Sequence, residues 1–232
     1  MTEAEWLVSP DPLRLMNHLW RGRPYPVTTR KTRLLVCASL RRIWHLLSEK
    51  GRRILEVVER HADRLVPYAE MESANFRYAE CHSREDYAVY YGASSSAGLR
   101  TLLRTILSYA AESVEEASGG ESGLQDRIET TSCPESVAQS RLVREIFRNP
   151  FRPVALDSAW LTWQDGIVPR LAQAAYEHRT LPAGTLDNAR LAVLADALEE
   201  AGCHDQDILG HCRSGGEHVR GCWVVDALLG KE

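Results

Sequence analysis

The last thirty residues of this chain concentrate side chains that can bind a metal ion. Three cysteines and three histidines fall within twenty residues, at Cys203, His204, His211, Cys212, His218 and Cys222. Thiolate sulfur and imidazole nitrogen are the ligands that zinc prefers in proteins. Cysteine is also among the most frequently buried residue types when it binds nothing. The crowding therefore indicates either a metal site or a dense helical core.

The spacing of these residues is compatible with both interpretations. On a helix predicted over 218–229, His218 and Cys222 are four residues apart and face one direction. A tetrahedral zinc site would take its ligands from Cys203, His211, Cys212, His218 and Cys222. Against zinc, the chain has no C-x-x-C pair, and Val225 and Leu229 continue an apolar stripe through His218 and Cys222. We therefore expect a buried core without a cofactor, and keep structural zinc binding as the alternative.

Other site chemistry finds little support in the sequence. No serine stands in a glycine-framed nucleophile motif, and no cysteine has a papain-like context. The glycine-rich stretch 118–123 lacks the lysine and the preceding strand of a phosphate-binding loop. Acidic pairs such as Glu199–Glu200 are typical of solvated helical faces. The sequence therefore favours a protein without catalytic residues.

A basic segment between Arg21 and Arg64 is a candidate for nucleic-acid binding. Twelve Lys and Arg residues stand there against four Asp and Glu residues, although the whole chain carries a formal charge of −4. The candidate phosphate contacts are Arg30, Lys31, Arg41, Arg42, Arg52 and Arg53. No helix-turn-helix and no interleaved exposed aromatics accompany them. Nucleic-acid binding is therefore a second alternative, because such a charge excess also suits packing against an acidic half.

Two of the six tryptophans lie in a segment without helical periodicity. We expect Trp160 and Trp163 to be partly exposed, and exposed tryptophans often mark protein interfaces. A helical protein–protein interaction or adaptor module without catalytic activity is therefore the leading functional hypothesis. Its partner would be a protein.

Helical periodicity dominates the chain and predicts an all-α fold of about eight to ten helices without strands. The strongest pattern predicts a helix over 29–47, with a buried stripe through Val36, Leu40, Ile43 and Leu47. Capping residues mark several helix starts, because their side chains can accept hydrogen bonds from free backbone N–H groups. They include Thr2 with Glu5, Asp11 before Pro12, Ser48, Asp157, Asp165 and Asp205.

The polar, glycine-containing stretch 118–134 divides the predicted helices into two packed halves. We expect a basic N-terminal helical half over 1–117 and a C-terminal half over 135–232 that carries the Cys/His residues. The chain has 232 residues, no apolar run near membrane-span length and no signal-peptide pattern at its start. The expected compartment is the cytoplasm, with no membrane association.

Several segments together resemble an expanded group of bacterial helical proteins with an alanine-rich middle, to which no established activity is attached. The resemblance rests on MTEAEWL at the start, RRIWHLL at 41–47, NPFRPV at 149–154, AWLTW at 159–163, and LADALEEAGC followed by HVRGCWVVD near the end. It covers both ends well and the middle poorly. Similar sequences often hold further cysteines around Cys37, where this chain has Ser39 and Leu40. The resemblance therefore implies no metal or redox role for Cys37.

Overall fold

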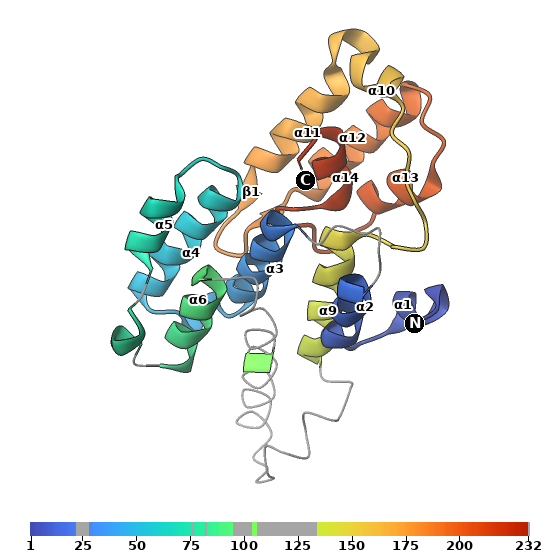
Figure 1. Cartoon of the computed structure of the whole chain (residues 1–232). Helices are drawn as coiled ribbons and strands as arrows, with labels where there is room; N and C mark the ends of the chain where they lie inside the picture. Colours follow the sequence, from blue (N-terminus) through green and yellow to red (C-terminus); the bar gives the residue numbers. More distant parts are fainter. Residues whose placement is uncertain (22–27, 76, 82, 95–103, 106–133, 232) are drawn as a thin grey trace. The chain divides into compact units, whose positions relative to one another are not determined.

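The computed structural model describes residues 1–21, 28–75, 77–81, 83–94, 104–105 and 134–231. These residues confirm the all-α class, with twelve α-helices, three 3₁₀ turns and one two-stranded sheet. They form two compact units, Met1–Arg144 and Glu145–Glu232 (Figure 1). Only Pro134 of the expected linker 118–134 is described, so a division at that linker stays a prediction. No helix among the described residues is long and apolar enough to cross a membrane.

The N-terminal unit contains short and medium helices, and several of them start at the predicted capping residues. Its helices are α1 (Glu3–Val8), α2 (Pro12–Arg21), α3 (Thr29–Arg42), α4 (Glu49–Ala62), α5 (Tyr68–Ala74), α6 (Arg84–Ser94) and most of α9 (Pro134–Phe147), with 3₁₀ turns at Trp44–Leu46 and Tyr78–Glu80. Thr2 and Glu5 form the predicted capping box at the start of α1. Asp11 accepts from the backbone N–H groups of Leu13 and Arg14, and Ser48 caps α4.

Helix α3 is shorter than the predicted helix over 29–47. It ends at Arg42, because the backbone at Ile43 leaves helical geometry and Leu47 is extended before the Ser48 cap of α4. The predicted stripe is nevertheless buried on the unit's interior: Val36 and Leu40 on α3, and Ile43 and Leu47 just beyond it. The hydrophobic pattern therefore identified the buried face correctly and missed the break between α3 and α4.

The C-terminal unit contains α10 (Ser158–Thr162), a 3₁₀ turn (Trp163–Asp165), α11 (Ile167–Glu177), α12 (Asn188–Glu200), α13 (Gln206–Cys212) and α14 (Trp223–Leu228). Asp157 caps α10 and Asp205 caps α13, as predicted. Asp165 does not cap α11, because its own backbone has a positive φ and Gly166 takes the cap position.

Two corrections concern the segments around the expected C-terminal helix. A short antiparallel pair joins β1 (Arg179–Thr180) to β2 (Thr185–Leu186), where no strand was expected. The final helix begins at Trp223 and not at 218. The segment before it is held to β2, because the Leu186 N–H donates to the carbonyl oxygen of His218 at 2.8 Å and Val219 bridges to Thr185. Gly221 then turns the chain with φ +90°.

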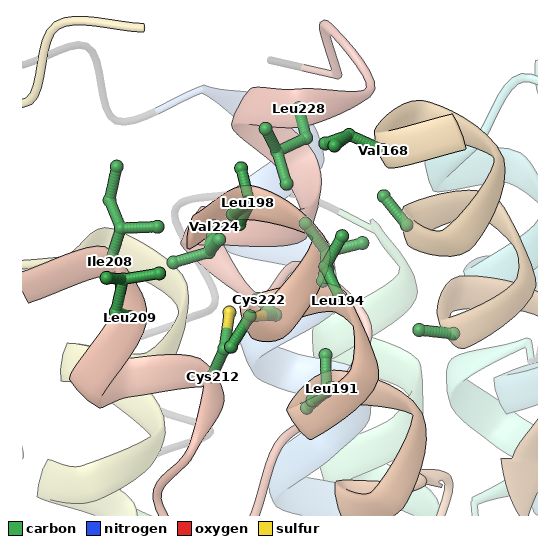
Figure 2. Close-up of a cluster of buried hydrophobic side chains, with 14 of the residues drawn as sticks. Val168, Leu191, Leu194, Leu198, Ile208, Leu209, Cys212, Cys222, Val224 and Leu228 are labelled. Atoms are coloured by element: carbon green, nitrogen blue, oxygen red, sulfur yellow. The ribbon is translucent and has the colours of Figure 1, made fainter. Parts of the chain in front are cut away.

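The core of the C-terminal unit lies between its helices (Figure 2). Leu191, Leu194 and Leu198 project from one face of α12 at helical spacing, which is why this helix is buried along one side. The side chains that meet them include Val168, Ile208, Leu209, Val224 and Leu228. The buried thiols of Cys212 and Cys222 extend this core toward the polar cluster described next.

Candidate metal centre

Four side chains of the C-terminal unit bring metal-ligating atoms together. Glu145, His211, His218 and Cys222 each offer one ligand atom, and these atoms all lie within 4.8 Å of one another. They come from three segments: the last turn of α9, the end of α13, and the turn-rich stretch between α13 and α14. We refer to them as the four-residue cluster.

Glu145 is the anionic member of the cluster and is nearly fully buried. Its neighbours Ile146 and Phe147 are buried apolar residues, so the last turn of α9 carries the carboxylate into the interior. One carboxylate oxygen, Oε1, lies 3.1 Å from Nδ1 of His218 and accepts from the Val219 N–H at 3.4 Å. The other, Oε2, lies 3.2 Å from Nε2 of His211. Both oxygens therefore receive hydrogen bonds.

His211 is held from two sides. It sits one residue before the end of α13, a helix that Asp205 caps. The Trp223 indole donates from Nε1 to Nδ1 of His211 at 3.2 Å. On the other side of the ring, Nε2 lies 3.3 Å from Sγ of Cys222 as well as close to Glu145.

His218 is positioned by hydrogen bonds to both its backbone carbonyl oxygen and its imidazole ring. Its carbonyl oxygen accepts from β2, and its side chain is 1% exposed. While Nδ1 faces Glu145, Nε2 lies 3.0 Å from Oγ and 3.3 Å from the carbonyl oxygen of Ser214. Ser214 therefore fixes the ring from outside the cluster.

The electrostatics of the cluster follow from its burial and from the two imidazoles. Burial alone would raise the pKa of Glu145, but hydrogen bonds from His211 and His218 outweigh it and lower that pKa to about 2. Burial would lower the pKa of His218, and the hydrogen bond and charge of Glu145 reverse this and raise it. Burial raises the pKa of the Cys222 thiol well above its usual range. Without a metal, the cluster therefore holds a carboxylate next to a protonated thiol.

The cluster could hold a metal ion. It offers one carboxylate oxygen, two imidazole nitrogens and one sulfur, which is a mixed donor set that suits a borderline-soft divalent ion. Oxygen-seeking ions such as Mg²⁺ and Ca²⁺ are poorly matched, because only one of the four donors is oxygen.

The structure brings together three of the five predicted ligands. His211, His218 and Cys222 belong to the cluster, whereas Cys203 and Cys212 lie in the hydrophobic core and are not part of it. Burial raises the pKa of Cys203, and it raises that of Cys212 to about 12, so both thiols are protonated at neutral pH.

Glu145 was missed because it lies 66 residues before His211 in the chain. A sequence signal does exist. Glu145 lies among the apolar residues Leu142, Val143 and Ile146, so it falls within the buried face of α9. A charged residue on such a face is uncommon unless it is paired. The pattern therefore predicts a buried carboxylate, but it does not predict which residues pair with it.

The two tryptophans proposed as contact residues pack on the core of the same unit. Trp160 is 9% exposed and belongs to the core, while Trp163 is half-buried and packs against it. The expected partial exposure is therefore found for Trp163 only. Trp160 lies on α10, a short helix where the sequence indicated a non-periodic segment, and its side chain packs into the core of the unit.

The candidate nucleic-acid residues lie in the N-terminal unit, and most of them have acidic partners there. The guanidinium groups of Arg30, Arg41, Arg42 and Arg53 pair with Asp63, Glu59, Glu135 and Glu49 respectively. The Arg41–Glu59 pair is buried. Arg52 donates to the carbonyl oxygens of Trp44 and His45, and lies over the Trp44 ring. These ion pairs reduce the charge that phosphates would meet.

No family model matches the chain, and neither a curated protein nor a solved structure matches it. What the chain does is therefore inferred from the geometry of the four-residue cluster.

Proposed function

We propose that residues 145–232 form a zinc-binding helical module in which the ion has a structural role. The observation that carries this proposal is the convergence of four ligand atoms within 4.8 Å from Glu145, His211, His218 and Cys222. Zinc takes Cys, His and carboxylate ligands in four-coordinate tetrahedral sites. The four-residue cluster supplies one ligand for each position.

A structural role is favoured over a catalytic one by the number and burial of the ligands. Catalytic zinc sites keep one position for water or substrate, with three ligands from the protein. Here the protein offers four, and Glu145, His218 and Cys222 are buried while only His211 is partly exposed. Zinc would therefore tie the end of α9, the end of α13 and the segment before α14 to one another.

Zinc binding requires Cys222 to lose its proton. Burial keeps this thiol protonated, and a metal ion replaces the proton and stabilises the thiolate. Because binding must displace a proton, zinc affinity should fall as the pH is lowered.

The test is the zinc content of the full chain, purified without a histidine tag. We expect about one zinc per chain and a lower melting temperature in a strong chelator. The matched variants are Cys222→Ser and Cys203→Ser, because both thiols are fully buried in one core and only Cys222 belongs to the cluster. Cys222→Ser should abolish zinc binding and Cys203→Ser should retain it.

Cobalt(II) substitution gives a second measurement. A cobalt–thiolate bond produces charge-transfer absorption, which Cys222→Ser should lose and Cys203→Ser should keep. Substantially less than one zinc per chain, together with a melting temperature that chelator leaves unchanged, would overturn the proposal.

We also propose protein–protein interaction as a second function, supported by exposed apolar side chains at the junction of α4 and α5. Leu65 is 63% exposed and Tyr68 is 51% exposed, three residues apart. Affinity capture from the native host would compare the wild type with Leu65→Ser/Tyr68→Ser and with Trp163→Ala. Loss of one reproducible partner in the first variant supports this surface, and identical recovery with all three proteins contradicts it.

A further inference from the structure

The hydrogen bond between Trp223 and His211 fixes which nitrogen of His211 carries a proton. The indole Nε1–H is a donor and never an acceptor, so Nδ1 of His211 must offer its lone pair across the 3.2 Å contact. The hydrogen of the neutral imidazole then sits on Nε2, between Oε2 of Glu145 at 3.2 Å and Sγ of Cys222 at 3.3 Å.

The orientation of the ring is set by the same contacts. Rotating the His211 ring by half a turn would exchange each nitrogen with a ring carbon. The Trp223 N–H and the carboxylate of Glu145 would then both lose a partner in a partly buried site. Both hydrogen bonds therefore require the ring as it stands.

A metal ion in the cluster needs the opposite tautomer. The atom of His211 that faces the other three ligands is Nε2, and it can bind a metal only through its lone pair. The hydrogen must then sit on Nδ1, where it would point at the indole N–H 3.2 Å away. Two donors cannot share that contact, so full metal ligation and the Trp223 hydrogen bond exclude each other.

In the same cluster, the outer nitrogen of His218 already faces hydrogen-bond acceptors. Its Nδ1 faces Glu145, and its other nitrogen meets Oγ and the carbonyl oxygen of Ser214 at 3.0 and 3.3 Å. Such an acceptor holds the outer N–H of a metal-bound histidine and fixes its tautomer. His218 can bind a metal by giving up the hydrogen on Nδ1 while it keeps its outer contacts with Ser214. His211 must also lose its outer contact with Trp223.

We propose that Trp223 is a positioning residue that opposes metal binding at His211, so that the centre switches between two exclusive states. In the metal-free state, Trp223 donates to His211 and His211 donates to Glu145. In the metal-bound state, Nε2 of His211 loses its proton to solvent, Nδ1 takes one up, and the indole leaves Nδ1. This inference rests on the proposed zinc binding.

The consequence reaches the start of α14. Trp223 is the first residue of that helix and is only 8% exposed, packed in the core of the unit. Moving its indole away from His211 therefore changes the packing at the beginning of α14, and Trp223 would report metal occupancy to the rest of the unit.

The test compares zinc affinities of the wild type, Trp223→Phe and Trp163→Phe, by competition with a chromophoric chelator. Trp223→Phe removes the opposing donor and keeps an aromatic ring. Trp163→Phe removes an indole that packs on the same core outside the cluster. We expect Trp223→Phe to bind zinc about 2- to 10-fold more tightly than the wild type, the range that one hydrogen bond allows. Trp163→Phe should match the wild type.

A second measurement uses the wild-type chain, so it does not depend on a variant. Long-range ¹⁵N–¹H spectra report which nitrogen of His211 carries hydrogen; we expect Nε2 without metal and Nδ1 with zinc. Unchanged or weaker zinc affinity in Trp223→Phe, or a tautomer that zinc leaves unchanged, overturns this inference and leaves the zinc proposal standing. Zinc binding by none of the three proteins overturns both.

Discussion

At the scale of single residues, the burial of Glu145 decides how the cluster behaves without metal. Its carboxylate accepts hydrogen bonds from two histidine rings and one backbone N–H in a nearly dry environment. A buried charge that loses its partner is strongly destabilising, whereas an intact pair is close to neutral. Glu145 is therefore the residue whose replacement tests the cluster most directly.

We expect Glu145→Gln to lower the free energy of unfolding by about 3 kcal/mol in the presence of chelator. The amide replaces one of the two carboxylate oxygens with an NH2 donor, and each oxygen faces a different histidine, so the amide cannot accept from both. His218 can lose its proton in this variant and become neutral. The loss of stability should then lie near the lower end of the range for a broken buried ion pair. Urea denaturation measures the difference. Glu200→Gln, at an exposed position of the same unit, is the control and should stay within ~0.5 kcal/mol of the wild type. Equal stability of the two variants would contradict the assigned role of Glu145.

The sequence identified three of the four residues of the cluster, but it missed Glu145 and wrongly added Cys203 and Cys212. His211, His218 and Cys222 stand out because zinc ligands are rare residue types and these are crowded. Glu145 could not be assigned to them, because nothing local in α9 identifies residues packed 66 or more positions later. The same limit explains Cys203 and Cys212, since a cysteine in an apolar core and a cysteine ligand have the same local pattern.

At the scale of secondary-structure elements, α3 provides the clearest test of the predicted core. Leu40 is 1% exposed on the buried stripe of this helix. Truncating a buried leucine removes apolar contacts and leaves a cavity, so Leu40→Ala should lower stability by about 2–5 kcal/mol. Leu46→Ala, at a 44% exposed position just after α3, should have a much smaller effect. A change below ~1 kcal/mol for Leu40→Ala in chemical denaturation would place the stripe outside the core.

Capping residues located several helix starts correctly, because a cap is a local hydrogen bond between a side chain and a nearby N–H group. The β1–β2 pair escaped prediction, because two residues per strand are too few for an alternating pattern. The segment from His218 to Cys222 matched helical spacing. It is non-helical because β2 pairs with its backbone and Gly221 adopts a positive φ, and both features depend on the folded unit.

Gly221 should influence zinc binding because its backbone turn positions the neighbouring Cys222. At φ +90° a side chain is strained, and Gly221 directly precedes Cys222. We expect Gly221→Ala to destabilise the chain by roughly 1–3 kcal/mol and to weaken zinc binding by displacing Cys222. Gly202→Ala is the matched control, because Gly202 has φ +93° and an added Cβ meets no atom within 4 Å. The control should lose similar stability and keep its zinc affinity. Equal zinc affinity in both variants would show that the turn does not position the thiol.

At the scale of the whole molecule, the four-residue cluster belongs to one of the two units. All four residues of the cluster lie within Glu145–Glu232, whereas the buried ion pair Arg41–Glu59 and the α3 stripe belong to Met1–Arg144. A ligand that binds only the native state stabilises what it holds together. Zinc should therefore stabilise the C-terminal unit directly.

Hydrogen exchange of the full chain, measured by mass spectrometry with zinc and with chelator, tests this expectation. We expect zinc to slow exchange most in peptides covering α13 and the segment 213–222, because metal bonds to His211, His218 and Cys222 would suppress local opening there. Peptides from α3 and α4 contain none of these ligands and should exchange at the same rate in both conditions. Cys222→Ser should remove the zinc effect, and Cys203→Ser should preserve it. Protection spread evenly over both units would contradict a local structural ion, because it would mean that zinc stabilises the chain as a single cooperative body.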